Sequence, residues 1–169
     1  MDTKIDILER EVIYMNAYEL LEDRACRDGM EVIQRNFKSD RIKGLYCDGV
    51  IAINKSIETT AEKTCVLAEE MGHHETSFGN IINLSDSWNL KQERQARLYG
   101  YNDRIGLLGL IRAYEHGCSN QHEIAEYLEV TEEFLCEAVE CYRDKYGVCT
   151  SVDNYTIYFI PNLIIYKKI

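Results

Sequence analysis

The stretch from Thr59 to Thr76, TTAEKTCVLAEEMGHHET, constrains the fold of this chain more than any other. Its pattern predicts a single helix, with Thr59 or Thr60 as the N-cap, and Thr59 and Glu62 have the spacing of a capping box. Near its end the helix carries Glu69, Glu70, His73 and His74 within six consecutive positions. We therefore expect ionisable groups of two kinds, carboxylate and imidazole, on a short length of helix.

The spacing of these groups is typical of a metal site. Glu69 and His73 are four residues apart, so on a helix they share one face and lie one turn from each other. Zinc peptidases with the HExxH motif use two ligands at this spacing, with a glutamate directly after the first ligand as the general base. Here Glu70 has the place of that glutamate, whereas the first position is Glu69 and not histidine.

A catalytic zinc site needs three protein ligands, so a third must come from another part of the chain. The candidates are Asp86, Glu93 and His116. Glu93 is the most attractive, because it stands near the start of a predicted helix that can fold back across a loop. His74 points about 100° away from His73 on the helix, which makes it a poor ligand for the same ion.

The rest of the chain predicts short strands and further helices. A helical pattern covers residues 5–36, with a break at 27–29 before a short extended piece around Met30 to Ile33. Residues 42–54 predict two antiparallel strands joined by an Asp48-Gly49 turn. The second of these strands could offer an edge to an extended substrate peptide. A helix is expected from Leu90, broken near 100–102 and ended by Gly117, and one or two strands follow between 155 and 168.

Residues 119–146 have the spacing of a helix-turn-helix, with Thr131 as the N-cap of the second helix. The acidic residues of this segment outnumber the basic pair Arg143 and Lys145; they are Glu123, Glu126, Glu129, Glu132, Glu133, Glu137, Glu140 and Asp144. A recognition helix must approach phosphates, so this charge opposes DNA binding. We interpret the segment as a packing or docking module.

The composition favours a compact protein that does not bind nucleic acid or membranes. The formal net charge is −10, and no apolar run is long enough to span a membrane. The seven cysteines form no CxxC pair, and no secretory leader is visible, so the cytoplasm is the expected location. The basic residues of the helix after Leu90 are expected on a solvated face; they are Lys91, Arg94, Arg97, Arg104 and Arg112.

Three segments of the chain, GLYCDGVIAIN, CVLAEEMGHH and QERQAR, resemble the ImmA/IrrE-type metallopeptidases, in particular the short forms carried by phages and mobile elements of Gram-positive bacteria. The resemblance covers roughly residues 16–147. It implies that Glu70 is the catalytic base, that His73 is a metal ligand, and that Glu93, with Ala96 three residues later, is the third ligand. It also implies a zinc cofactor and a helix-turn-helix repressor as the protein substrate.

The chain departs from that family pattern at Glu69, which stands where the first histidine ligand is expected. A site made of Glu69, His73 and Glu93 is harder and more negative than one with two histidines, so manganese or iron are alternatives to zinc. Two functions stay open besides metallopeptidase activity. The chain could be an inactive member that binds a regulator or counters a host defence, or, against its charge, a DNA-binding protein through residues 120–142.

The expected fold class is α+β, with a small antiparallel sheet packed on a zincin-like active-site helix and a helical lobe following it. We expect a metallopeptidase-like domain over residues 1–117, a helix-turn-helix-like lobe over 118–146, and C-terminal strands over 147–169 that pack on the body.

Overall fold

The computed structural model describes residues 15–76 and 86–168, with the side chains of residues 86–89 left out. The first described element is helix α2 (Ala17–Arg27). Asn16 caps it, since the Asn16 side chain accepts from the Glu19 N–H and the Glu19 side chain accepts from the Asn16 N–H. The predicted break at 27–29 is confirmed, because α2 ends at Arg27, and the extended piece expected around Met30 to Ile33 belongs to a strand that begins at Glu31. Residues 5–14 lie outside the description.

The first sheet contains β1 (Glu31–Arg35), β2 (Gly44–Cys47) and β3 (Val50–Asn54). The strand order is β1-β3-β2, with β3 parallel to β1 and antiparallel to β2. Asp48 and Gly49 have φ values of 47° and 82°, so the predicted hairpin turn between β2 and β3 is confirmed. Because β3 is the central strand, the expectation that it offers a free edge is wrong; β2 is the edge strand on this side.

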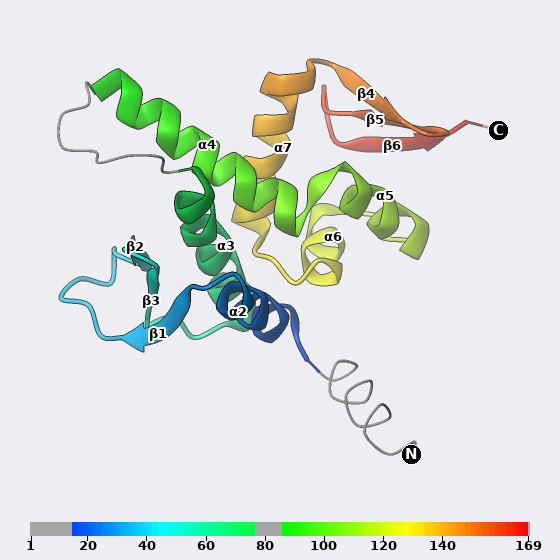
Figure 1. Ribbon diagram of the computed structural model, residues 1–169. Helices are drawn as coiled ribbons and strands as arrows, with labels where there is room; N and C mark the ends of the chain where they lie inside the picture. The colour runs from blue at the N-terminus through cyan, green and yellow to red at the C-terminus, as the bar shows by residue number, and fades with distance from the viewer. Residues whose placement is uncertain (1–14, 77–85, 169) are drawn as a thin grey trace, which may run out of the picture.

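Helix α3 (Thr60–Thr76) packs against β2, β3 and α2, and occupies the middle of the molecule (Figure 1). Its start is confirmed at Thr59, whose Oγ1 accepts a hydrogen bond from the Glu62 N–H at 3.2 Å. The reciprocal half of the capping box is replaced by an ion pair between Glu62 and Lys43 at 2.9 Å. Leu67 and Met71 are fully buried, which fixes the helix on the core.

Helix α4 (Asp86–Arg104) crosses α3 and is followed directly by α5 (Gly106–His116), which ends at a left-handed Gly117 as predicted. Two expectations for this region are wrong. The helix begins before Leu90, and it continues through Gly100 to Arg104. Gly100 stands within the continuous helix, where its missing side chain lets α4 approach the backbone of Ala68 in α3.

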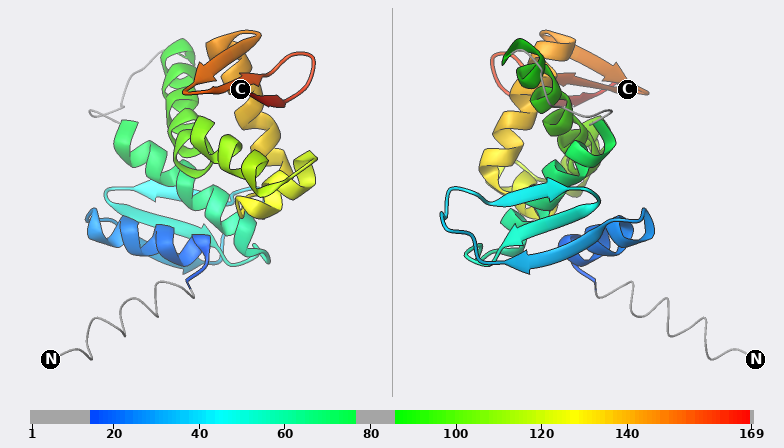
Figure 2. Two further views of the ribbon diagram at one scale, coloured as in Figure 1. Left: turned by 90° about the vertical axis from the view of Figure 1, so that its right-hand side faces the viewer. Right: turned by 60° about the vertical axis from the view of Figure 1, so that its left-hand side comes forward.

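A helical lobe of α6 (Gln121–Tyr127) and α7 (Glu132–Tyr146) follows, with Thr131 capping α7 as predicted. The chain then forms a second sheet of β4 (Cys149–Val152), β5 (Tyr155–Tyr158) and β6 (Ile164–Lys167), all antiparallel. The two sheets lie at opposite ends of the molecule (Figures 1 and 2). The α+β class is confirmed, and the C-terminal strands do not join the first sheet. Over the described residues, no helix is long and apolar enough to cross a membrane.

Candidate metal centre

His73 of α3 and Glu93 of α4 face each other where these two helices cross. His73 Nε2 and Glu93 Oε2 are 3.4 Å apart. This separation is long for a hydrogen bond. Two ligand atoms bound to one tetrahedral zinc ion at about 2.0–2.1 Å are roughly 3.4 Å apart, so the pair is spaced as two ligands of one ion would be.

Small residues on both helices set this approach. No Cβ fits on Gly72 of α3, because it would collide with the backbone of Ala96 in α4, and a Cβ on Gly100 would lie 3.1 Å from the carbonyl oxygen of Ala68. Ala96 is fully buried. Ala96 stands three residues after Glu93, so the contact that buries Ala96 also turns Glu93 toward His73.

Glu69 lies one turn before His73 on α3 and is half-buried. Burial, more than any other cause, raises the pKa of Glu69 to about 7, while the nearby Arg97 guanidinium opposes this and Glu137 and Glu93 add to it. Among the side chains that the structure describes, no three His, Cys, Asp or Glu groups stand together closely enough to hold an ion. His73 and Glu93 are thus brought together, whereas Glu69 is near them without completing a three-ligand cluster.

Glu70 faces away from α4 toward the edge strand β2. Burial first, and the neighbouring Glu69 second, raise the pKa of Glu70 to about 7, while the nearby Tyr46 backbone N–H opposes this rise. A Cβ built on Gly44 would lie 2.8 Å from Glu70 Oε1, so only glycine leaves room for this side chain. A carboxyl group with a pKa near 7 is suited to general base chemistry at neutral pH.

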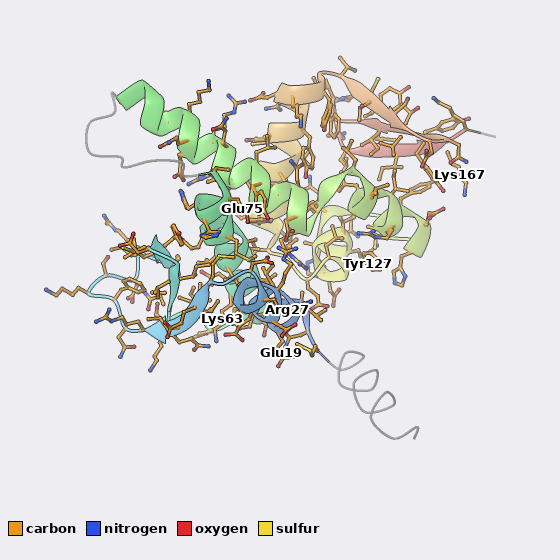
Figure 3. All side chains as sticks on the ribbon, viewed as in Figure 1. Glu19, Arg27, Lys63, Glu75, Tyr127 and Lys167 are labelled. Atoms are coloured by element: carbon orange, nitrogen blue, oxygen red, sulfur yellow. The ribbon has the colours of Figure 1, made fainter. Side chains whose placement is uncertain are left out.

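The other candidate ligands have different surroundings. His74 Nδ1 and Tyr46 Oη are hydrogen bonded at 2.8 Å, and the two rings meet edge to face, so His74 anchors β2 to α3. His116 stacks on Tyr127 of α6 with ring centroids 4.6 Å apart. The Asp86 side chain lies outside the description. Figure 3 marks Glu75, the residue after His74, toward the end of α3 where α4 crosses it.

Sequence reasoning missed Arg97 and Glu137 as parts of this region. Arg97 Nε donates to Glu93 Oε1 at 2.9 Å, and Arg97 Nη1 is 3.9 Å from Glu137 Oε2 of α7. The solvated face expected for the basic residues of α4 is therefore only partly correct, and it is wrong for Arg104, whose side chain is only 18% exposed. The spacing of four between Glu93 and Arg97 was the available signal, since residues at this spacing meet on a helix.

The donor set fits a divalent ion in its chemistry. Carboxylate oxygen and imidazole nitrogen both bind zinc, manganese and iron. Glu69 and Glu70 are buried enough to raise their pKa, which is the condition that a bound cation relieves.

Helix α3, which carries an imidazole and carboxylates, thus packs on a small sheet, and α4 brings the Glu93 carboxylate close to the His73 imidazole. The sequence matches the family Peptidase_M78, described as the IrrE N-terminal-like domain, over residues 25–140, and the chain belongs to this family. The resemblance to ImmA/IrrE proteins is thereby confirmed. A search of curated proteins found no match. Membership brings a metal-dependent, protease-like function in general, with a metal ion and a protein substrate.

Proposed function

We propose that the protein is a metal-dependent endopeptidase that cleaves a helix-turn-helix repressor or another regulatory protein of a phage or mobile element. Glu69, His73 and Glu93 would hold the ion, with zinc as the first choice and manganese or iron as alternatives. The observation that carries this proposal is the 3.4 Å separation between His73 Nε2 and Glu93 Oε2, two candidate ligands from different helices. Such a substrate would be met in the cytoplasm.

Glu70 would move the protons of the reaction. A bound divalent ion supplies a Lewis acid that lowers the pKa of water from about 15.7 to roughly 7. Glu70 takes a proton from the attacking water as the new C–O bond forms at the scissile carbonyl. It then gives a proton to the amine nitrogen as the C–N bond breaks, so the base returns to its starting state. A Glu70 pKa of about 7 suits both transfers.

The edge strand β2 would align the substrate. β2 has a partner strand on one side only, and its Tyr46 N–H already contacts Glu70. An extended peptide that added to this edge would therefore pass the catalytic base. The exposed Leu45 of the same strand, at 53% exposure, offers an apolar contact for a substrate side chain.

The test is Glu70→Gln, which keeps the shape of the side chain but removes the base. Purified wild-type and variant proteins are loaded with zinc and mixed with a helix-turn-helix repressor of the same element, and products are identified by mass spectrometry. We expect equal zinc content and cleavage by the wild type only. Cleavage at the wild-type rate by Glu70→Gln would refute the role of Glu70.

An inactive regulator is the second candidate function. It is favoured by one observation, that Glu69, His73 and Glu93 are not gathered into a three-ligand cluster in the part of the chain that the structure describes. It predicts no stoichiometric metal in the purified protein and unchanged partner binding by the double variant Glu70→Gln/His73→Gln. Elemental analysis of the protein as purified therefore separates the two functions.

A further inference from the structure

Glu93 uses both oxygens of its carboxylate. Oε2 lies 3.4 Å from His73 Nε2, while Oε1 accepts a hydrogen bond from Arg97 Nε at 2.9 Å. Arg97 stands one helical turn after Glu93 on α4, so this contact is local and does not depend on the crossing of the helices. The guanidinium thus fixes which carboxylate oxygen faces the imidazole.

A second helix holds the guanidinium in turn. Arg97 Nη1 is 3.9 Å from Glu137 Oε2 of α7, and the same oxygen accepts a hydrogen bond from Tyr101 Oη at 2.6 Å. The Tyr101 side chain is only 1% exposed and its ring meets Phe134 edge to face at 4.8 Å. Two side chains, Glu137 and Arg97, therefore connect the buried ring of Tyr101 to the candidate ligand Glu93.

We propose that Arg97 is a positioning residue, which presents Glu93 Oε2 to the metal ion and is itself held by Glu137 of the helical lobe. The inference rests on the proposed metal site. A glutamate side chain has several rotatable bonds, and a free Glu93 would lose their freedom when an ion binds. Arg97 restricts that freedom in advance, as hydrogen-bonding partners of metal ligands generally do.

A competing role for Arg97 predicts the opposite change in metal affinity. Arg97 is a cation beside the site, so if it only repelled the incoming ion, its removal would strengthen binding. If it positions Glu93, its removal weakens binding. The direction of the change in affinity therefore separates the two roles, and no assay of peptide cleavage is needed.

The chain supplies a matched control in Arg94. Arg94 also stands on α4 and also pairs with a carboxylate of α7, through Nη2 at 2.8 Å from Asp144 Oδ2. Arg94→Gln thus removes the same charge and the same kind of bridge between the same helices. None of the contacts described for Arg94 involves Glu93.

The experiment measures zinc affinity by competition with a chromophoric chelator, and the absorption spectrum of the cobalt-loaded protein. We expect Arg97→Gln to bind zinc about 10-fold more weakly, since partners of metal ligands typically account for 10- to 100-fold. Its cobalt spectrum should also change. Arg97→Lys keeps the charge without the Nε donor, so its zinc affinity should lie between that of the wild type and that of Arg97→Gln. The zinc affinity of Arg94→Gln should stay within about twofold of the wild-type value.

Glu137→Gln tests the link to α7. We expect a smaller loss than for Arg97→Gln, and no further loss when the two substitutions are combined, because Glu137 acts through Arg97. The role of Arg97 is refuted if Arg97→Gln binds zinc as tightly as the wild type or more tightly. It is also refuted if Glu137→Gln weakens zinc binding as much in the Arg97→Gln variant as it does in the wild type. Neither result would refute the proposed metal site. A wild-type protein that binds neither zinc nor manganese overturns the proposed metal site as well.

Discussion

Gly72 of α3 and Ala96 of α4 are in such close contact that no side chain fits on Gly72. The contact lies beside the candidate site, since His73 follows Gly72 directly and Glu93 stands one turn before Ala96. Helices that cross at small residues approach more closely than helices with large side chains at the contact. This pair therefore sets the distance between the two helices that supply the ligands.

Replacing Gly72 by alanine should push α4 away from α3. We expect a loss of about 1–3 kcal/mol in the free energy of unfolding, which is typical of overpacked contacts. Zinc affinity should fall with it, because Glu93 moves away from His73. Urea unfolding of the metal-free protein and zinc titration of the folded protein measure the two effects.

Gly109→Ala is the control for this prediction. Gly109 also lies within a helix, α5, but its added Cβ would meet Leu128 at an ordinary 3.4 Å. Since alanine is the better helix former, we expect unchanged or slightly raised stability there, by up to about 1 kcal/mol. Equal effects of the two substitutions would show that the crossing at Gly72 has no special role.

The two neighbouring histidines should respond differently to substitution. His73→Gln removes a proposed ligand and should weaken zinc binding by about 100-fold or more, with little change in metal-free stability. His74→Gln removes the hydrogen bond to Tyr46 and should cost about 1 kcal/mol of stability. Its zinc affinity should stay near that of the wild type, as measured in the same titration. The reverse pattern would assign the ion to His74.

The arrangement of the candidate site's residues along α3 could be predicted from the sequence. Glu69, Glu70 and His73 are separated by fixed helical spacing, so their relative directions follow from residue number alone. That His74 faces elsewhere followed in the same way and agrees with its contact to Tyr46. The position of Glu93 required a tertiary contact, and residue spacing alone could not supply it.

Other features could not be predicted because they depend on close packing between elements. Gly100 was interpreted as a helix break, since glycine is a poor helix former. In the structure Gly100 stands within α4, where the absence of a side chain allows the close packing of α4 on the backbone of Ala68. Strand β4 lies within the segment 147–169 where C-terminal strands were expected, but the sequence alternation begins only at residue 155, and β4 pairs with β5 across a turn in which Asp153 has a φ of 50°. The role of β2 as an edge strand depended on β1, which adds to the other side of β3.

The stability of the metal-free protein should fall between pH 5 and pH 8. The pKa of Glu69 and that of Glu70 are each about 7 in the folded chain, against 4.5 for an ordinary glutamate. The folded state thus keeps protons that the unfolded state has released, so this contribution is fully present below pH 4.5 and is lost as the pH rises through 7. Because both side chains are partly exposed, we expect a decrease of only about 1–2 kcal/mol.

Urea unfolding at a series of pH values measures this decrease. The double variant Glu69→Gln/Glu70→Gln should remove most of it, since neither amide titrates. The affinity for zinc should rise as the pH increases from 5 to 8, because the ion needs the carboxylate form of Glu69. A wild-type stability that rises from pH 5 to pH 8 by an amount that the double variant abolishes would contradict the burial of these carboxyl groups.

Glu69→His converts the site to the two-histidine set that zinc peptidases of the HExxH type use. The exchange removes one negative charge and replaces a hard oxygen donor by an imidazole nitrogen, which favours zinc over manganese. We expect the ratio of zinc affinity to manganese affinity to rise by about 10-fold relative to the wild type, measured by titration of both ions in one buffer. Glu69→Gln is the control, because it removes the same charge without supplying an imidazole, and it should weaken the binding of both ions. An unchanged ratio in Glu69→His would mean that the residue at position 69 does not bind the ion, which would leave His73 and Glu93 as its ligands from these two helices.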